Sequence, residues 1–253
     1  MCGIIGYIGK QQATPILLEG LRRLEYRGYD SAGFTILSDN QLLTRKKKGK
    51  IEEGLAHHIA SETLNGQIGL GHTRWATHGP PSDENSHPHY DQSGRIAVVH
   101  NGVIENYERL KERMPGHVFH SVTDTEVLAH LIGEHYAKLG PKNGSLEHPL
   151  AQAVMNALRE VIGAYGIAVL CSDFPDVLIG ARRGSPLIVG VGEGENFLSS
   201  DANAIAPHTR QVIYLNDYDV VTLTADRFVV AGLGTDIAKV QISKLEFDAG
   251  AVE

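Results

Sequence analysis

The sequence predicts a layered α+β fold rather than a regularly alternating α/β fold. From residue 165 onward, short apolar runs are separated by turns, a pattern typical of sheets built mostly from antiparallel hairpins. Helical segments lie between short strands earlier in the chain, without the strict alternation of a doubly wound parallel sheet. With 253 residues, 42% of them hydrophobic, the chain can bury one substantial core, so we expect a single domain over 1–253.

The first 100 residues are expected to form strands around two helices. One helix should begin with Thr14 as N-cap and Pro15 at its first position, because apolar residues follow at helical spacing. Asp39 and Asn40 mark a turn between two strands, and a second helix is expected at 51–60. The strands are predicted at 3–8, 32–38, 41–47, 67–73 and 95–100.

The rest of the chain is expected to contribute further helices and a larger sheet. Thr123 and Glu126 form a capping-box signature that predicts a helix start with Asp124 in the first turn, and another helix is expected at 149–162. The stretch 78–94 is longer than loops that compact domains usually carry without a function, so it is a candidate functional loop. The strands are predicted at 166–172, 176–183, 186–191, 195–200, 210–215, 219–224 and 227–232.

Composition and charge argue against several classes of protein. The net charge is −7, so the chain lacks the positive field of a nucleic-acid binder. No apolar stretch approaches the roughly 18 residues of a membrane span. Two cysteines cannot form a disulfide framework, and the first residues do not resemble a secretory signal. We therefore expect a cytoplasmic protein with neither nucleic acid nor membrane as partner.

Histidine pairs are the main metal-like signal. His57-His58 and the His87-Pro88-His89 segment stand without a nearby cysteine cluster, whereas zinc usually needs three or four protein ligands. The sequence also lacks the Gly-x-Gly-x-x-Gly spacing of a dinucleotide site. We expect no metal and no cofactor, and a metal-binding loop at His87 is the alternative.

Cys2 is the strongest candidate for a catalytic residue. Removal of Met1 would leave a thiol and a free α-amine on the same residue, and the amine, with a pKa near 7.7 to 8.0, is a built-in general base. A base that accepts the thiol proton converts cysteine into a competent nucleophile. The alternative is a small residue near a frayed terminus, which the apolar strand directly after it disfavours.

Three further motifs contain polar residues with two interpretations each. Arg74 could bind a carboxylate bidentately or form a surface salt bridge. Asn101-Gly102 could be a hairpin turn or an oxyanion hole, in which a side-chain amide and a backbone N–H face one developing negative oxygen. Asp124 could complement the helix dipole or pair with an ammonium group.

Five motifs occur in the order found in one enzyme family. They are CGIIGYIG from residue 2, RRLEYRGYDSAG at 22–33, HTRWATHG at 72–79, HNGVIENY at 100–107 and TDTE at 123–126. Together they resemble the N-terminal glutaminase domain of the glucosamine-6-phosphate synthase family, a branch of the class II glutamine amidotransferases. LEYRGYDSAG resembles the hexosamine branch, since purine-pathway relatives are expected to read closer to HRGQDAAG.

The resemblance implies an N-terminal-nucleophile hydrolase fold, a four-layer α/β/β/α sandwich with two mostly antiparallel sheets. It implies L-glutamine as substrate, removal of Met1 and catalysis by Cys2. By resemblance, Arg74 would hold the α-carboxylate of glutamine and Asp124 its α-ammonium. The remaining implied site residues are Trp75, Thr77 and His78 in a lid, and Asn101 and Gly102 in the oxyanion hole.

Full members of this family continue into an isomerase region that binds fructose 6-phosphate and receives ammonia through a channel. This chain stops before such a region, so we expect it to hydrolyse glutamine only. The resemblance implies the isomerase region as partner and a homodimer of the full-length protein. Two alternatives stay open: the glutaminase domain of another class II amidotransferase, and a non-catalytic binding domain on the same fold.

Overall fold

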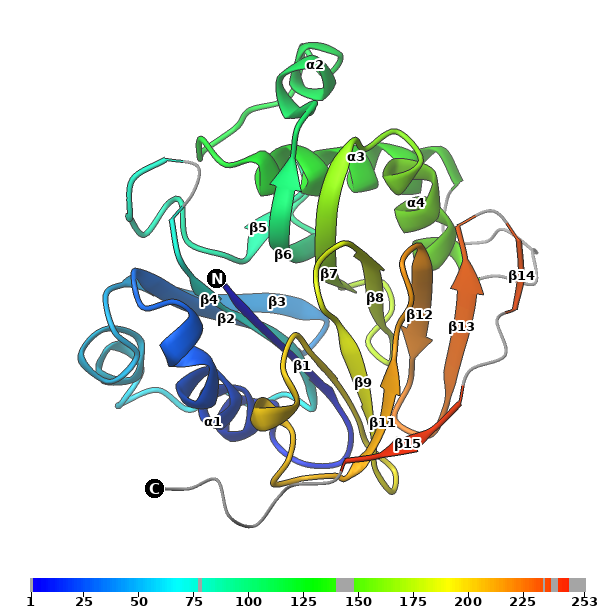
Figure 1. The fold of residues 1–253 in the computed structure, drawn as a ribbon. Coiled ribbons are helices and arrows are strands. Elements are labelled where there is room, and N and C mark those ends of the chain that lie inside the picture. The colour runs from blue at the N-terminus through cyan, green and yellow to red at the C-terminus, as the bar shows by residue number, and fades with distance from the viewer. Residues whose placement is uncertain (1, 77–78, 140–147, 234, 238–240, 246–253) are drawn as a thin grey trace.

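Two antiparallel sheets pack face to face, and helices cover their outer faces (Figure 1). The computed structural model describes residues 2–76, 79–139, 148–233, 235–237 and 241–245. The layers follow the order helix, sheet, sheet, helix, which confirms the predicted α+β sandwich. Within the described ranges, no helix is long and apolar enough to cross a membrane.

The first sheet is built around the N-terminal strand. Its strands in the described residues are β1 (Gly3–Ile8), β2 (Ser31–Ser38), β3 (Gln41–Lys48), β4 (Ile68–Arg74), β9 (Ile188–Val191), β10 (Asn196–Ser199), β11 (Gln211–Tyr214) and β15 (Ser243–Lys244). Their order is β15-β11-β9-β10-β1-β4-β2-β3. The turn between β2 and β3 has φ values of 49° at Asp39 and 61° at Asn40, the left-handed backbone that a two-residue hairpin requires.

The second sheet contains the longest strand pair. Its strands in the described part of the chain are β5 (His89–Tyr90), β6 (Ile96–Ile104), β7 (Gly163–Cys171), β8 (Leu178–Arg183), β12 (Asp219–Leu223), β13 (Phe228–Gly232) and β14 (Thr235–Ile237), in the order β14-β13-β12-β8-β7-β6-β5. β6 continues through Asn101 and Gly102, which pair with Gly166 and Tyr165 of β7. The hairpin interpretation of Asn101-Gly102 is therefore wrong, because nine residues of antiparallel pairing override a local turn preference.

Helices lie on both outer faces. They are α1 (Ala13–Leu24), α2 (Tyr107–Glu112), α3 (Asp124–Leu139) and α4 (Pro149–Leu158). The predicted start of α3 is confirmed, and the Glu126 N–H donates to Thr123 Oγ1 at 3.4 Å. The second hydrogen bond of the capping box is not formed, because the Glu126 carboxylate accepts from the N–H groups of His120 and Ser121 at 2.8 and 2.6 Å. The prediction of Thr14 as N-cap of α1 is wrong: Gln12 holds that position, and the Thr14 hydroxyl donates to Leu64 O at 3.2 Å.

Two other helix predictions need adjustment. The segment predicted as a helix at 51–60 contains a π-helix over Glu52–Ala56, and α4 ends at Leu158, four residues earlier than expected. Within the candidate functional loop at 78–94, the short strand β5 was not predicted. His78 lies outside the described residues.

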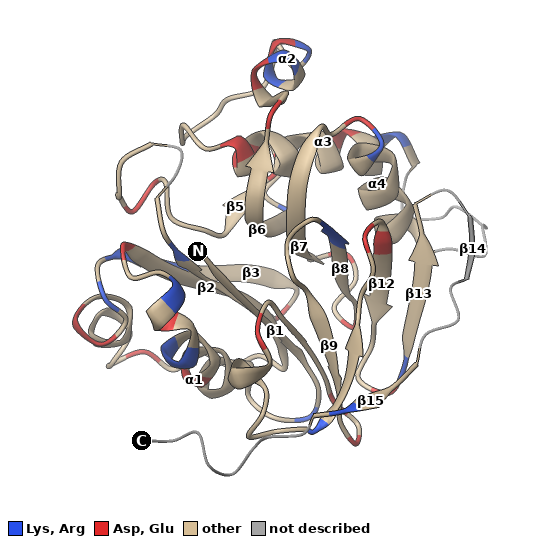
Figure 2. Ribbon diagram, viewed as in Figure 1, with Lys and Arg blue, Asp and Glu red and all other residues tan. Residues whose placement is uncertain are grey.

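Three apolar layers hold the sandwich together. The first lies between α1 and the first sheet, the second between the two sheets, and the third between the second sheet and α3 with α4. In the middle layer, Ile4 of β1 and Leu198 of β10 share a buried cluster with Val99 of β6 and Leu170 of β7. Figure 2 shows charged residues mainly on the helices, in loops and at strand ends, away from the facing strands. The two sheets are therefore joined by apolar burial, which fixes their relative position.

Candidate active site

A pocket of about 340 Å³ opens where the two sheets meet α3. Cys2 directly before β1, the end of β4 of the first sheet, β6 of the second sheet and the start of α3 all contribute to it. Its lining includes six predicted site residues: Cys2, Arg74, Trp75, Asn101, Gly102 and Asp124. Further lining residues are Arg27, His87, His100, Val103, Thr123, Thr125, Ser185 and Pro186. The volume is within the range of small-molecule sites, about 300 to 1,000 Å³.

Cys2 lies at the start of β1 and faces the end of β4. Pairing of Gly3 with Thr73 places Cys2 beside Trp75, whose backbone N–H donates to Cys2 Sγ at 3.2 Å. Asp30 fixes this part of the chain, because its Oδ2 accepts a hydrogen bond from the Ala76 N–H at 2.8 Å. Burial raises the pKa of the Cys2 thiol, and the hydrogen bond from Trp75 partly opposes that rise. The thiol therefore needs a nearby base to become a nucleophile.

Arg74 is a buried cation in the wall of the pocket. Only 3% of the residue is exposed, and its guanidinium donates to Gly79 O at 3.3 Å and to Pro80 O at 3.4 Å. These bonds hold the side chain at the pocket, where a guanidinium can bind a carboxylate in a planar fork. The surface salt bridge considered from the sequence does not fit this burial.

Asp124 occupies the first turn of α3, opposite the end of β6. Its Oδ2 accepts a hydrogen bond from the Ile104 N–H at 2.8 Å and lies 4.0 Å from His100 Nδ1. The residue is 5% exposed and lines the pocket. Asp124 thus joins α3 to β6 and also brings a carboxylate to the pocket that contains Arg74.

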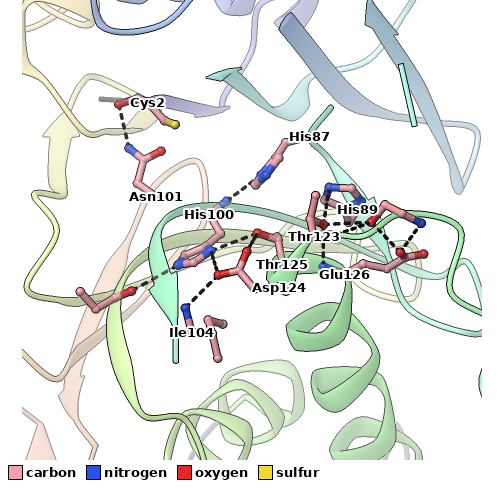
Figure 3. A network of polar contacts seen from close by, with 12 residues as sticks. Cys2, His87, His89, His100, Asn101, Ile104, Thr123, Asp124, Thr125 and Glu126 are labelled. Carbon is pink, nitrogen blue, oxygen red and sulfur yellow. Dashed lines mark hydrogen bonds and ion pairs between the residues drawn. The ribbon is translucent and has the colours of Figure 1, made fainter. Parts of the chain in front are cut away.

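Asn101 connects the two sheets at the pocket (Figure 3). Its Nδ2 donates to the backbone oxygen of Cys2 at 3.1 Å, and its Oδ1 lies 3.0 Å from His72 Nε2. The next residue, Gly102, has a φ of 135°, and a Cβ there would lie 2.0 Å from Ala164 O. Only glycine fits this position, which brings a backbone amide to the pocket lining beside the Asn101 side chain.

Four buried histidines surround this connection, and sequence reasoning did not group them. His72 stacks on His87 with ring centroids 4.1 Å apart, and His89 packs edge-on against His87 at 4.8 Å. His100 Nδ1 lies 3.0 Å from the Thr125 hydroxyl. A signal was present in the sequence, because His72 and His100 fall within the motifs that carry Arg74 and Asn101.

Burial holds three of these imidazoles, those of His72, His87 and His89, in their neutral form. Burial lowers the pKa of His72 to about 3 and places those of His87 and His89 well below 6.5. Among the described residues, no group of three or more His, Cys, Asp or Glu side chains has an arrangement that could hold a metal ion. His87 Nδ1 instead accepts a hydrogen bond from the His100 backbone N–H at 3.2 Å.

The expected lid is described only in part. Trp75 is 45% exposed, and its ring packs edge-on against Tyr29 with centroids 5.4 Å apart. Thr77 and His78, the other two residues expected in the lid, lie outside the described residues.

Comparisons with known proteins identify the family. Residues 56–143 match the family described as glutamine amidotransferase domain. The chain is 51% identical over 228 residues to the glutamine–fructose-6-phosphate aminotransferase (isomerizing) of Clostridium tetani. It is 48% identical over 256 residues to the enzyme of the same name from Caldanaerobacter subterraneus subsp. tengcongensis. The chain contains a glutamine amidotransferase domain.

The alignments cover 89% and 100% of this amidotransferase domain, but only 36% and 40% of those two relatives. The matched part is the N-terminal, glutaminase half of the relatives. Among solved structures, the chain resembles glutamine phosphoribosylpyrophosphate amidotransferase from B. subtilis, with a TM-score of 0.75 and 26% identity. That match covers 93% of this chain and 50% of the other, and it confirms the predicted N-terminal-nucleophile hydrolase fold.

Proposed function

We propose that this chain hydrolyses L-glutamine to L-glutamate and ammonia, with Cys2 as the nucleophile. The observation that carries the proposal is that Cys2, Arg74, Asn101 and Asp124, from both sheets and α3, line one pocket of amino-acid size. Arg74 would bind the α-carboxylate of glutamine and Asp124 its α-ammonium. The carboxamide end of the substrate then faces Cys2 and Asn101.

The proposed reaction begins with removal of Met1, which frees the α-amine of Cys2. That amine accepts the thiol proton, directly or through one water, and the sulfur attacks the carboxamide carbon of glutamine. Asn101 Nδ2 and the Gly102 N–H stabilise the tetrahedral oxyanion. Ammonia leaves with the proton held by the amine, and a γ-glutamyl thioester remains. Water hydrolyses the thioester, which yields glutamate and restores the thiol.

We further propose that the ammonia serves glucosamine-6-phosphate synthesis from fructose 6-phosphate. The support is the named activity of relatives that are about half identical to this chain, against 26% identity to the phosphoribosylpyrophosphate enzyme. In this proposal the isomerase region of a full-length synthase, as a homodimer, is the partner that consumes the ammonia. Trp75, Thr77 and His78 would form the lid over bound glutamine.

The test compares glutamate and ammonia release by the parent chain, Cys2→Ala and Cys171→Ala. Cys171 is the matched control, because it is a free thiol in β7 that is buried and lies outside the pocket lining. We expect Cys2→Ala to abolish turnover and Cys171→Ala to retain it. Equal losses from both variants would contradict the assignment of Cys2.

Intact mass spectrometry tests the same assignment without turnover. A diazoketone analogue of glutamine should add once to chains that begin with Cys2, and not to the Cys2→Ala variant. Chains that retain Met1 should neither be labelled nor release ammonia at the processed rate, because an amide nitrogen is not a base. Full activity with Met1 retained would refute the amine as general base.

A further inference from the structure

His72 lies behind the pocket and touches the side chain that we assign to the oxyanion hole. It projects from β4 of the first sheet toward β6 of the second and is 1% exposed. Its Nε2 lies 3.0 Å from Asn101 Oδ1 and 3.1 Å from His100 O. Both partners are oxygen acceptors without a proton, so the hydrogen bonds exist only if Nε2 carries the proton.

The other ring nitrogen agrees with this tautomer. His72 Nδ1 is buried and has no hydrogen-bond partner in the part of the chain that the structure describes. An N–H there would lack an acceptor, whereas a bare nitrogen in an apolar contact is less costly. The pKa of His72, lowered by burial to about 3, keeps the ring neutral at ordinary pH. The ring plane is fixed by His87, which stacks on it at an interplanar angle of 12°.

The orientation of the Asn101 amide decides whether a donor or an acceptor faces Cys2. With Oδ1 toward His72, Nδ2 donates one proton to Cys2 O and has a second proton for a developing oxyanion. With the amide flipped, Oδ1 would face the Cys2 backbone oxygen and the oxyanion. The partial negative charge on Oδ1 would then repel the negative charge on both oxygens. A donor on the His72 side therefore favours the orientation that catalysis needs.

We propose that His72 is a positioning residue that fixes the Asn101 amide, through its Nε2–H, as the oxyanion donor. The inference rests on the proposed function, because it gives His72 a role in the same reaction. His72 touches neither the pocket nor the substrate position, so its effect passes through Asn101.

Two variants separate the hydrogen bond from the packing. His72→Leu removes the donor and keeps an apolar side chain in the space, whereas His72→Gln keeps an amide N–H that can reach Asn101 Oδ1. We expect His72→Leu to lower kcat for glutamine by about 10- to 100-fold. This loss is smaller than the loss of about 10²- to 10³-fold expected when an oxyanion donor is missing altogether. KM should stay within about twofold, because the amino-acid end of glutamine is bound elsewhere. His72→Gln should recover most of kcat.

A double-mutant comparison tests whether the effect passes through Asn101. In an Asn101→Ala background the amide is gone, so adding His72→Leu should lower kcat no further. The proposal would be overturned if His72→Leu lowered kcat in the Asn101→Ala background as much as it does alone. A kcat equal to that of the parent in the single variant His72→Leu would also overturn it. A change in KM without a change in kcat would also overturn it.

The tautomer itself can be measured on the parent chain, which does not depend on a variant folding. Nitrogen-15 NMR of histidine-labelled protein should show His72 protonated at Nε2 and bare at Nδ1 at pH 7. An Nδ1–H tautomer or an imidazolium would overturn the proposal. If the parent chain releases no glutamate, the proposed function fails instead. If the parent chain hydrolyses glutamine, Cys2→Ala is inactive and His72→Leu is as active as the parent, only the role of His72 is refuted.

Discussion

Mild acid should destabilise the folded chain, because His130 of α3 and three of the histidines around the pocket, His72, His87 and His89, are buried as neutral imidazoles. Burial lowers the pKa to about 3 at His72 and to about 4 at His130, and to well below 6.5 at His87 and His89. In the unfolded chain each imidazole titrates near pH 6.5. Below that pH the unfolded state binds more protons than the folded state. The stability from these groups is therefore complete above pH 6.5 and is lost as pH falls toward the folded-state values.

The size of the effect follows from the number of groups. For His72 and His130, nearly two protons separate the two states between pH 6 and pH 5, which lowers the free energy of unfolding by about 2 kcal/mol. His87 and His89 act in the same direction. This is a substantial fraction of the whole stability of many domains, about 5 to 15 kcal/mol. Carboxylates with lowered pKa values, such as Asp83 and Asp201, add to the loss only at lower pH, near and below their unfolded values of about 4. The window from pH 6.5 to 5 thus reports the histidines.

Urea unfolding at pH 7, 6 and 5, followed by far-ultraviolet circular dichroism at constant ionic strength, measures this loss. His130→Gln should reduce the loss of free energy of unfolding between pH 6 and pH 5 by about 1 kcal/mol, because it removes one of the titrating groups. His58→Gln is the matched control and should leave the dependence unchanged, since His58 is exposed. A free energy of unfolding that stays constant from pH 7 to 5 would refute the reasoning.

Substitutions at three residues test the pocket directly. Arg74→Lys keeps the positive charge but loses the planar guanidinium, so KM for glutamine should rise strongly. If the variant still discriminates as strongly as the parent against a glutamine analogue without the α-carboxylate, Arg74 does not bind the α-carboxylate. Asn101→Gly should fold and lose about 10²- to 10³-fold in kcat, and Asn101→Asp should lose more, because its negative charge would face the oxyanion. A near-normal kcat in Asn101→Gly would remove Asn101 from the mechanism. Gly102→Ala should lower the melting temperature and the activity together, because its φ of 135° and a Cβ 2.0 Å from Ala164 O displace β6 from β7. A melting temperature equal to that of the parent would contradict this close approach.

Local signals in the sequence predicted the elements whose causes are local. The β2–β3 turn was predicted because Asp39 and Asn40 tolerate the left-handed backbone that the hairpin requires, and the start of α3 because Thr123 can cap it. The turn preference of Asn101-Gly102 misled the prediction, because pairing with a distant strand decides the backbone there. No local pattern reports a partner more than 60 residues away.

The same distinction applies to the candidate site. Cys2 and Arg74 were found from their own chemistry and from the motif resemblance, and the structure places both in one pocket. The stacked imidazoles of His72 and His87 were missed, because they lie on different segments that come together only in the folded sandwich. A histidine is recognised as buried and neutral only when its neighbours are known.

The hydrogen bond from Asn101 Nδ2 to Cys2 O crosses from one sheet to the other, so the pocket exists only when the sheets have docked. Neither sheet can form the pocket alone, because Cys2 directly precedes β1 and Arg74 ends β4 of the first sheet, while Asn101 and Gly102 belong to β6 of the second. A chain in which the sheets have not docked would hold Cys2 without the rest of the pocket around it. Completion of the pocket is therefore coupled to the docking of the two sheets.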